Sequence, residues 1–406
     1  MKISVFLSFI SGVNAFQVFQ KKVYSSALCS TISTDHLKKS GCGLPFVPSG
    51  NNLLFDPEQE GKLCGTGSLA NRISSGPNYV LPSDVSILTA VEPPPGTEIL
   101  SAQHWLEYLS EDLPLNFAKP NNPVKATVLG RSKLISDDAP GDIQHVLMRL
   151  PTGMHYVEGQ SLSVIPPGID PKTHKKYAPR LYSIASTRYG DLLDGNTVSL
   201  CVRRAEYYDP VTNLPDPERK GVCSNFLCDV QPGDEIHVAG PVGKTMLLPS
   251  NSDDDIVMIA TGTGIAPFRG FMHRLFMEET VARHMFGGTA WLILGVPTSG
   301  GLLYEEEIDV MLKNSNPGQL RVDYAISREM KNQSGGKMYV QDVIAQNANE
   351  FFERLDNGAS CYFCGLKGMM PPILETLEKV ALAKGLDWNE KLKGWKNNHQ
   401  WHVEVY

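Results

Sequence analysis

The chain of 406 residues, 42% of them hydrophobic, is too long for one ordinary domain and can bury a core large enough for two. Its formal net charge of −7 argues against a nucleic-acid-binding protein. The sequence also contains no apolar run of the length needed to span a bilayer.

Residues 1–34 have the composition of a targeting leader. Lys2 precedes an apolar stretch over residues 3–10, which is shorter than a membrane span. A basic, hydroxyl-rich stretch follows, and the first acidic residue is Asp35. Together the two parts resemble the bipartite leader of proteins sent to the plastids of secondary-endosymbiotic algae, in which cleavage often precedes a Phe such as Phe16. A plain secretory signal is the alternative, and it would imply an oxidising compartment with paired cysteines.

The eight cysteines speak against that alternative, because they are too sparse for a disulfide framework. Cys361 and Cys364 form a C-x-x-C pair within a stretch that has the pattern of a buried strand. Side chains three residues apart on a strand point to opposite faces, so the two sulfurs should not meet. We therefore expect neither a disulfide nor a metal site at this pair, and no metal site elsewhere.

Residues 35–116 are rich in Gly, Pro and Ser and are expected to form an irregular extension, with a helix only over 101–113. From residue 117 to about 250, short strand patterns separated by turn signals predict an antiparallel barrel or sandwich. These predicted strands cover residues 124–135, 142–150, 159–166, 180–187, 197–206 and 234–243.

Residues 251–406 follow a different rhythm, in which apolar runs alternate with helical stretches. This order predicts a parallel sheet with crossover helices, and hence an α/β domain. The apolar runs are 256–261, 289–296, 321–327 and 359–366, and the helical stretches include 266–279 and 370–385. The final stretch, 401–406, alternates like a strand and ends on Tyr406, with Glu404 on the same face.

The stretch IVMIATGTGIAPFRGF, residues 256–271, places a buried strand before a glycine-containing turn and a helix that starts near Pro267. Glycines such as Gly264 let the backbone approach a ligand, and a helix start offers N–H groups to a phosphate. Pro267 replaces the third glycine of the dinucleotide fingerprint, so a tight structural turn remains the alternative to a phosphate site.

The stretch APRLYSIAST, residues 178–187, combines three useful side chains in one strand pattern. Arg180 suits a pyrophosphate, Tyr182 can stack on a flat ring, and the hydroxyl of Ser183 can bond a ring nitrogen. Arg180 and Tyr182 share one face, and Ser183 takes the other unless a bulge redirects it. An ordinary barrel strand fits the same pattern.

Seven motifs taken in order resemble plant-type ferredoxin–NADP⁺ reductases. They are RLYSIAST, GVCSNFLCD, GPVGK, ATGTGIAPFRGF, LGVPTS, CGLKGM and the final VEVY. The resemblance runs from about residue 117 to 406 and leaves the first 116 residues outside it. It implies an FAD-binding antiparallel β-barrel over 117–250, followed by a Rossmann-like NADP-binding α/β domain with a parallel sheet over 251–406.

The resemblance also implies the residues that hold FAD. Arg180 should bond the pyrophosphate, Tyr182 should cover one face of the flavin, and Ser183 should lie near its reactive N5 atom. Cys201 and Arg203 match the strand that follows, and Tyr207 matches the aromatic that stacks on adenine, although Tyr208 is adjacent. Val222, Cys223 and Ser224 fall at the FAD phosphate loop, where a helix start favours an anion.

The same resemblance assigns the NADP site. The residues that match its 2′-phosphate site are Ser327, Arg328, Lys337, Tyr339 and Gln341, the last three as alternate residues of a strand or extended loop. The turn residues Thr263, Gly264 and Pro267, and Gly365 with Leu366, belong to the same site. Cys364 should lie beside the nicotinamide, Glu404 should work with Ser183 in proton transfer to N5, and Tyr406 should cover the second flavin face.

The expected activity is one-electron transfer from ferredoxin to FAD, followed by hydride transfer to NADP⁺. Ferredoxins are acidic, so basic clusters should dock them, with flavodoxin as an alternative partner. The candidate docking residues are Lys172, Lys175 and Lys176, and Lys391, Lys393 and Lys396. Two alternatives stay open: a reductase running from NADPH to ferredoxin in a non-photosynthetic plastid, and a flavoprotein tethered by residues 35–116 to a thylakoid membrane or antenna complex.

Overall fold

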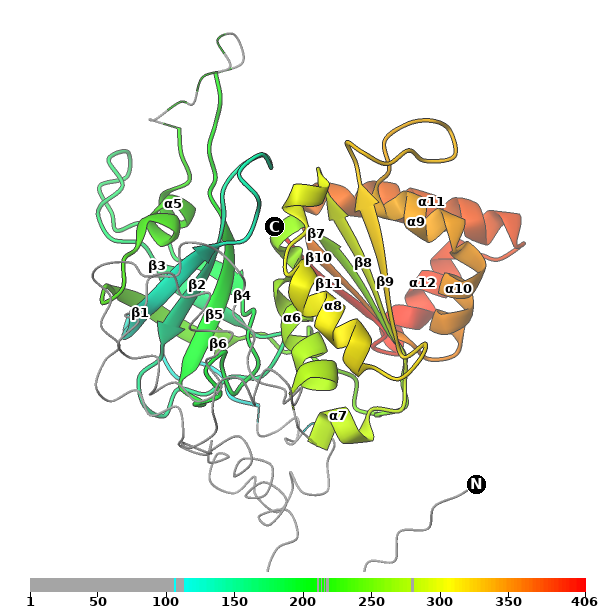
Figure 1. The fold of residues 1–406 in the computed structure, drawn as a ribbon, viewed down its shortest axis with the longest axis horizontal. Helices are drawn as coiled ribbons and strands as arrows, with labels where there is room; N and C mark the ends of the chain where they lie inside the picture. The colour runs from blue at the N-terminus through cyan, green and yellow to red at the C-terminus, as the bar shows by residue number, and fades with distance from the viewer. Residues whose placement is uncertain are drawn as a thin grey trace, which may run out of the picture.

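The computed structural model describes residues 106, 113–209, 212, 214, 216, 219–278 and 281–406 (Figure 1). The predicted leader, most of the extension and all but residues 106 and 113 of the helix predicted over 101–113 lie outside the described residues. Within the described part of the chain, no helix is long and apolar enough to cross a membrane.

The first layer is a six-stranded antiparallel sheet in the order β4-β3-β6-β1-β2-β5. Its strands are β1 (Val124–Lys133), β2 (Ile143–Arg149), β3 (Ser161–Ile165), β4 (Arg180–Ser183), β5 (Thr197–Arg203) and β6 (Glu235–Val242). A bridge between Ile184 and Leu200 joins the two outer strands, so the sheet closes on itself. The predicted antiparallel barrel is therefore confirmed, and all six of its predicted strands form.

Helix α5 (Val222–Asp229) packs against this barrel. Its buried residues Cys223, Leu227 and Cys228 join the apolar cluster that fills the barrel, together with Leu162 and Ile184. Burying one face of the helix fixes the direction of its axis, so its amino-terminal end is held in place.

The second layer is a five-stranded sheet in the order β11-β10-β7-β8-β9, in which all neighbours are parallel. Its strands are β7 (Ile256–Thr261), β8 (Ala290–Val296), β9 (Leu320–Ile326), β10 (Ser360–Gly365) and β11 (Trp401–Val405). The connecting helices are α6 (Ala266–Met272), α7 (Val281–Met285), α8 (Glu305–Asn314), α9 (Val340–Gln346), α10 (Ala348–Asp356), α11 (Met370–Ala383) and α12 (Trp388–Asn397). The predicted parallel sheet with crossover helices is confirmed.

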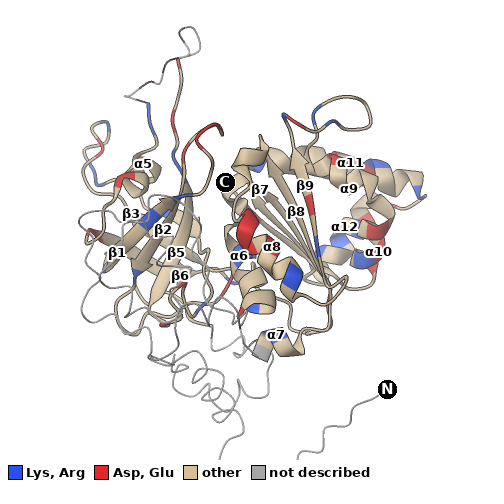
Figure 2. Cartoon of the chain, viewed as in Figure 1, with Lys and Arg blue, Asp and Glu red and all other residues tan. Residues whose placement is uncertain are grey.

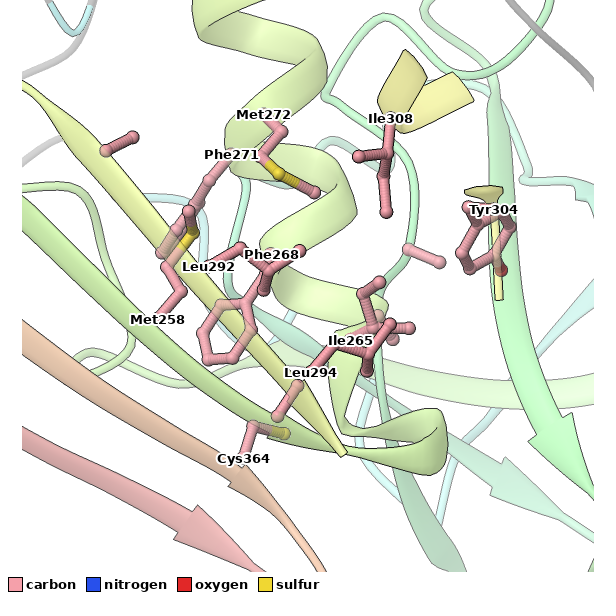
Figure 3. Packing of buried hydrophobic residues seen from close by; sticks show 14 of the residues in the cluster. Met258, Ile265, Phe268, Phe271, Met272, Leu292, Leu294, Tyr304, Ile308 and Cys364 are labelled. Atoms are coloured by element: carbon pink, nitrogen blue, oxygen red, sulfur yellow. The ribbon is translucent and has the colours of Figure 1, made fainter. Parts of the chain in front are cut away.

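Alternate residues of the parallel strands fill two separate cores, because side chains on a strand point to opposite faces in turn. Met258 and Cys364 pack under α6 with Phe268 and Phe271, as Figure 3 shows. Cys361 belongs to the core on the other face. The two cysteines are free and lie on opposite faces of the sheet, as the strand pattern predicted.

The barrel and the parallel sheet share one of these cores. The cluster under α6 also includes Val157, Ala185 and Met246, which belong to the barrel part of the chain. The Tyr362 hydroxyl donates to the Leu247 carbonyl at 2.6 Å. The shared core holds the two layers against each other, so side chains from both can build a common site.

A buried ionic network lies within this interface. Arg269 on α6 donates to Asp191 of the barrel at 2.8 Å and to Glu307 on α8 at 2.7 Å. His145 on β2 bonds Asp191 at 2.8 Å, and His273 bonds Glu307 at 2.8 Å. All five side chains are at most 2% exposed, so the network is part of what joins the domains.

Candidate active site

The carboxyl ends of parallel strands meet at one edge of the sheet, where α/β proteins bind ligands. The turn after β7, the end of β10 and the end of β11 meet at this edge. In Figure 1 the carboxyl terminus lies there, between the two sheets. The barrel strands β3 and β4 face it from the other side, through hydrogen bonds to Glu404.

The turn after β7 approaches β10 so closely that only glycine fits. A Cβ atom added at Gly264 would lie 2.0 Å from the Cys364 carbonyl oxygen, and one at Gly365 would lie 2.2 Å from the Thr261 hydroxyl. Gly365 also has a φ of +140°, which favours glycine. The tight approach leaves backbone, not side chains, facing the edge of the sheet.

Pro267, which the resemblance assigned to the NADP site, lies at the start of a helix. It is buried in the first turn of α6, directly after the short 3₁₀ helix Gly262–Ile265. Its fixed φ angle suits a helix start, where its missing N–H costs no hydrogen bond. Its role in the described structure is therefore to begin the helix.

Tyr406 is held at three points. Its backbone N–H donates to the Gly365 carbonyl at 3.0 Å, and its carbonyl accepts from Lys367 at 2.9 Å. Its hydroxyl lies 2.6 Å from that of Thr263 in the turn after β7. The residue is nevertheless 59% exposed, so the ring presents a broad surface at the edge of the sheet.

Four polar side chains converge across the domain interface. Glu404 on β11 pairs in register with Cys364 on β10. Its Oε1 atom accepts from the Ser183 hydroxyl at 3.3 Å and from the Ser161 hydroxyl at 2.8 Å. Burial raises the pKa of Glu404, and the two serine hydrogen bonds oppose that rise. Burial also raises the pKa of the Cys364 thiol, which interacts with both Glu404 and Ser183.

The structure therefore brings together Ser183, Cys364 and Glu404, which the sequence predicted as a group. It adds Ser161, which the sequence analysis missed. Ser161 lies opposite Ser183 in the antiparallel pairing of β3 and β4, so its side chain points to the same side. The only available signal was its place in a predicted strand, since the contact with Glu404 spans 243 positions.

The barrel side of the site has the donors that a pyrophosphate requires. Arg180 is exposed, and the hydrogen bonds described for its guanidinium are to the carbonyls of Ala178 and Pro179. It acts electrostatically on Tyr182 and on Cys223, which places it near the start of α5. That start has no side-chain cap and no acidic residue in its first turn, so its N–H groups suit an anion.

Other predicted FAD residues take different positions. Tyr207 and Val222 are exposed, at 51% and 41%, and can offer apolar surface to a ligand. Ser224 accepts from the Ala205 N–H at 3.1 Å and so fixes the loop before α5. Cys201 is buried, and its thiol interacts with Tyr304, so any ligand contact of Cys201 would have to come from its backbone.

Arg203 ends β5, where it is exposed and acts electrostatically on Tyr406. This places a cation from the barrel near the edge of the parallel sheet. Leu366, which follows β10, is 56% exposed, and its N–H donates to the Thr261 hydroxyl at 3.1 Å. Both residues are therefore open to a ligand at the expected edge.

Four of the five predicted 2′-phosphate residues follow β9 and precede α9, and Gln341 lies within α9. Arg328, Lys337 and Tyr339 are exposed, and the Arg328 N–H donates to the Pro297 carbonyl at 2.9 Å, which fixes the backbone after β9. Ser327 is half-buried beside Arg328. Two cations, a serine and a tyrosine hydroxyl form a donor set that suits a phosphate.

One local prediction was wrong. The stretch 337–341 is not extended throughout, because α9 begins at Val340 and places Gln341 in its first turn. Asp342 accepts from the Tyr339 N–H at 2.8 Å, which satisfies a backbone donor at the helix start. Gln341 therefore does not share a strand face with Lys337 and Tyr339.

The two lysine clusters lie on opposite sides of the molecule in the view of Figure 2. Lys172, Lys175 and Lys176 are exposed on the loop between β3 and β4, which Asp170 holds in a turn through Lys172 N–H at 2.9 Å. The other cluster lies on α12, which precedes β11, whereas Tyr406 follows it. The α12 lysines are therefore close in sequence to β11, but they lie before its amino end and not at its carboxyl end, where Tyr406 lies.

Within the α12 cluster the three lysines differ. Lys391 donates to Asp356 at 2.8 Å and is already paired. Lys393 and Lys396 are exposed. Only the latter two present their charges openly to a partner.

The residues present fit FAD and NADP. For FAD the barrel offers a guanidinium, an uncapped helix start and exposed aromatic surface. For NADP the parallel sheet offers the backbone of the glycine turn after β7, which packs closely against β10, and two exposed cations between β9 and α9. A barrel with a helix start that suits an anion, joined to a parallel sheet with a glycine turn at its carboxyl edge, defines a two-domain flavin- and nicotinamide-dependent oxidoreductase.

Comparison with known proteins agrees with this class and narrows it. A family described as "Oxidoreductase NAD-binding domain" matches residues 258–374. The chain is 53% identical over 301 residues to the chloroplastic embryo isozyme of ferredoxin–NADP reductase from Oryza sativa subsp. japonica, covering 73% of this chain and 79% of the relative. It is 50% identical over 297 residues to the chloroplastic enzyme of Chlamydomonas reinhardtii, covering 73% of this chain and 83% of the relative.

A solved structure shares the fold. Ferredoxin–NADP⁺ reductase from Plasmodium falciparum with 2′P-AMP aligns with a TM-score of 0.56 and 24% identity, covering 72% of this chain and all of that one. The chain belongs to the ferredoxin–NADP reductase family. Its cofactors are FAD and NADP(H).

Proposed function

We propose that this oxidoreductase passes electrons between ferredoxin and NADP, with NADP⁺ reduction as its physiological direction. Bound FAD supplies the chemistry that couples one-electron and hydride transfer. The observation that carries the proposal is the convergence of Ser183, Cys364 and Glu404 across the domain interface, beside Tyr406. Side chains from the FAD-binding barrel and the NADP-binding sheet thus share one reaction site.

The barrel residues bind and orient FAD. Arg180 and the N–H groups at the start of α5 neutralise the pyrophosphate, with Val222, Cys223 and Ser224 forming that loop. Tyr182, half-buried against the apolar cluster of the barrel, would face one side of the flavin, and Tyr207 would offer its exposed ring to the adenine. Arg203 ends the neighbouring strand and adds positive charge, and Cys201 supports that strand from within the core.

Glu404 and Ser183 hold and move the proton. Burial favours the neutral form of Glu404, so the carboxyl can carry a proton near neutral pH more readily than an exposed one. Ser183 donates to Glu404 and lies on the same strand as Arg180 and Tyr182, which would hold the flavin. Its hydroxyl can therefore pass a proton between Glu404 and the flavin site. Cys364 fills the space beside them and helps exclude water.

The parallel sheet selects NADP over NAD. Thr263, Gly264, Gly365 and Leu366 shape the edge that receives the coenzyme. Ser327, Arg328, Lys337 and Tyr339 bind the 2′-phosphate, with Gln341 at the start of the following helix. Pro267 starts α6 behind this edge, and Tyr406 covers the surface that the nicotinamide must reach.

Ferredoxin docks by charge. The exposed lysines 172, 175 and 176 form a compact basic loop directly before Arg180, and ferredoxins are acidic. Flavodoxin, which is also acidic, would use the same loop. Lys393 and Lys396 extend the basic surface on the other domain, whereas Lys391 is held by Asp356.

A reductase running from NADPH to ferredoxin is a second candidate. Root isozymes from Oryza sativa subsp. japonica and Arabidopsis thaliana are 54% and 53% identical to this chain, whereas a leaf isozyme of Arabidopsis thaliana is 48% identical. In a non-photosynthetic plastid, NADPH is the available reductant.

The chloroplastic relatives assign the chain to the plastid. We propose the stroma or the stromal face of the thylakoid as its place, with residues 1–34 as the bipartite leader. Residues 35–116 would be an extension, and the domain boundary would fall near residue 250, between β6 and β7.

An absorbance spectrum of the purified chain, followed by titration with reduced ferredoxin, tests the proposal. We expect a flavin spectrum and ferredoxin-dependent NADP⁺ reduction. A chain without bound flavin, or one that reduces dyes with NADPH but does not respond to ferredoxin, would contradict it. Comparing the forward and reverse rates at equal ferredoxin concentration separates the two directions.

A further inference from the structure

Ser161 meets the reaction site from the barrel side. It is 4% exposed and lies opposite Ser183 in the antiparallel register of β3 and β4. Its hydroxyl donates to Glu404 Oε1 at 2.8 Å, whereas Ser183 donates to the same atom at 3.3 Å. Of the two hydrogen bonds to Glu404, that from Ser161 is the shorter.

The two serines differ in what else they can bond. A serine hydroxyl has one hydrogen and can donate to only one acceptor at a time. Ser183 is half-buried, and its hydroxyl also interacts with the Cys364 thiol, so its hydrogen has competing acceptors. Among the described residues, the Ser161 hydroxyl bonds Glu404 alone. Ser161 can therefore hold Glu404 when Ser183 turns away.

The ionised form of Glu404 depends on hydrogen-bond donors, because the side chain is largely buried. Burial opposes its ionised form, and the two serine hydroxyls are what favour that form. The titratable group facing it from β10 is Cys364, which in turn interacts with Cys201 on β5 and with Tyr406 after β11. The hydroxyls of Ser161 and Ser183 are therefore the main groups that stabilise the ionised form of Glu404.

We propose that Ser161 is a positioning residue for Glu404, holding the carboxylate in place while the Ser183 hydroxyl turns toward the flavin. This inference rests on the proton-transfer role proposed above for Ser183 and Glu404. Ser161 acts through Glu404, so removing Glu404 should abolish its influence.

The test compares Ser161→Ala with Ser161→Cys and Ser161→Thr in the flavin-loaded chain. Cysteine keeps the approximate size but is a poor donor, and threonine keeps the hydroxyl. Ser163→Ala is the matched control, because Ser163 lies two residues along β3, on the same face, and is 5% exposed. Each change is also made in a Glu404→Gln background.

The measurements are kcat and KM for NADPH-dependent dye reduction against pH, and the infrared carbonyl band of protonated Glu404 in the resting enzyme. Glu404→Gln identifies that band. We expect Ser161→Ala and Ser161→Cys to lower kcat about 5- to 10-fold with little change in KM, which is within the range of a proton-transfer contribution. Losing a donor to the carboxylate should move the pH profile and the infrared titration to higher pH.

Ser161→Thr should retain most of kcat, Ser163→Ala should match the unaltered chain, and Ser161→Ala should have no further effect when Glu404 is already Gln. Equal effects of Ser161→Ala with and without Glu404, or an unmoved infrared titration in Ser161→Cys, would overturn the proposal. If the unaltered chain itself lacks flavin or dye reduction, the proposed function fails instead. The two failures are therefore distinguishable.

Discussion

The hydroxyl groups of Tyr406 and Thr263 lie 2.6 Å apart, so the aromatic ring at the edge of the parallel sheet is tied to the glycine turn after β7. The Tyr406 residue is 59% exposed, and its backbone N–H is held by the Gly365 carbonyl. For nicotinamide to occupy the place of the ring, the side chain must move, and the hydrogen bond to Thr263 must break. Thr263 therefore helps to set how easily the coenzyme enters.

The first prediction follows from this bond. Tyr406→Ser removes the ring, so NADP⁺ should bind more tightly, NADH should become a better substrate, and turnover with NADPH should fall if the product then leaves slowly. Thr263→Val and Tyr406→Phe keep the ring but remove the hydrogen bond. A neutral hydrogen bond contributes about 0.5–1.5 kcal/mol, so each of these two substitutions should increase the affinity for NADP⁺ only a few-fold.

Difference spectroscopy of NADP⁺ binding provides the measurement. If the hydrogen bond is the cause, the double change Thr263→Val with Tyr406→Phe should equal either single change. Fully additive effects would show that the two residues act separately. Unchanged coenzyme choice in Tyr406→Ser would leave β11 as an ordinary edge strand.

The second prediction concerns coenzyme selectivity. Arg328→Ala should raise KM for NADPH much more than KM for NADH, because a charge-assisted contact with the 2′-phosphate is worth about 1.5–3 kcal/mol. Lys313 on α8 is an exposed cation of the same domain, so Lys313→Ala is the matched control. Steady-state kinetics with both coenzymes decides the matter, and a parallel rise for NADPH and NADH would refute the assignment.

The strands could be predicted from the sequence, whereas part of the site could not. All eleven strands of the described residues overlap stretches predicted from apolar runs or alternation, and all but β4 and β11 have buried residues. The convergence of Ser161 on Glu404 depends on how two domains pack, which no local pattern contains. The motif resemblance identified Ser183 and Glu404 but not Ser161, which also donates to Glu404.

Most helices that were not predicted are short and bury few residues. The buried residues of α8 are Glu307, Ile308 and Met311, and that of α12 is Trp395 alone, so an apolar stripe is hard to recognise. Helix α9 begins within a stretch whose alternation suggested an extended strand. The Asp342 carboxylate, which accepts from Tyr339 N–H, favours the helix start over that alternation.

The third prediction concerns ferredoxin docking. Reversing Lys175 and Lys176 to Glu should weaken ferredoxin-dependent activity steeply at low salt and leave NADPH-dependent dye reduction near normal, because exposed charges act mainly on encounter. Reversing Lys393 and Lys396 tests whether the α12 cluster contributes. Lys313→Glu changes the net charge by the same amount per residue on α8, outside both lysine clusters, and serves as the control. Equal losses with dye and ferredoxin would show that the loop does something other than docking.

The fourth prediction concerns the buried network at the domain interface. Burial raises the pKa of Asp191 and that of Glu307, but Arg269 and the neighbouring histidines together outweigh burial and hold both pKa values below their ordinary values. Breaking a buried ion pair by removing one partner costs about 3–5 kcal/mol, so Glu307→Gln should lower stability strongly at pH 7. Thermal unfolding of the flavin-loaded chain measures this.

The pH dependence of the network has a definite sign. Burial and Arg269 lower the pKa of His273 from its ordinary value of 6.5, so the unfolded chain takes up a proton before the folded chain does. Stability should therefore begin to fall as the pH drops below 6.5. The lowered pKa of Glu307 adds a further loss as the pH falls below its ordinary value of 4.5. Both contributions make the folded protein sensitive to acid.

His273→Gln isolates the first of these contributions. It should reduce the loss of melting temperature between pH 6.5 and 4.5, while His155 and His402, whose pKa values burial also lowers, contribute losses of the same sign. His237→Gln is the matched control, because His237 is exposed on β6. Melting temperatures across this pH range should then differ in slope between His273→Gln and the unaltered chain and coincide in slope for His237→Gln. Identical slopes in all three would show that His273 titrates alike in the folded and unfolded chains, and that the network does not set the acid sensitivity of the interface.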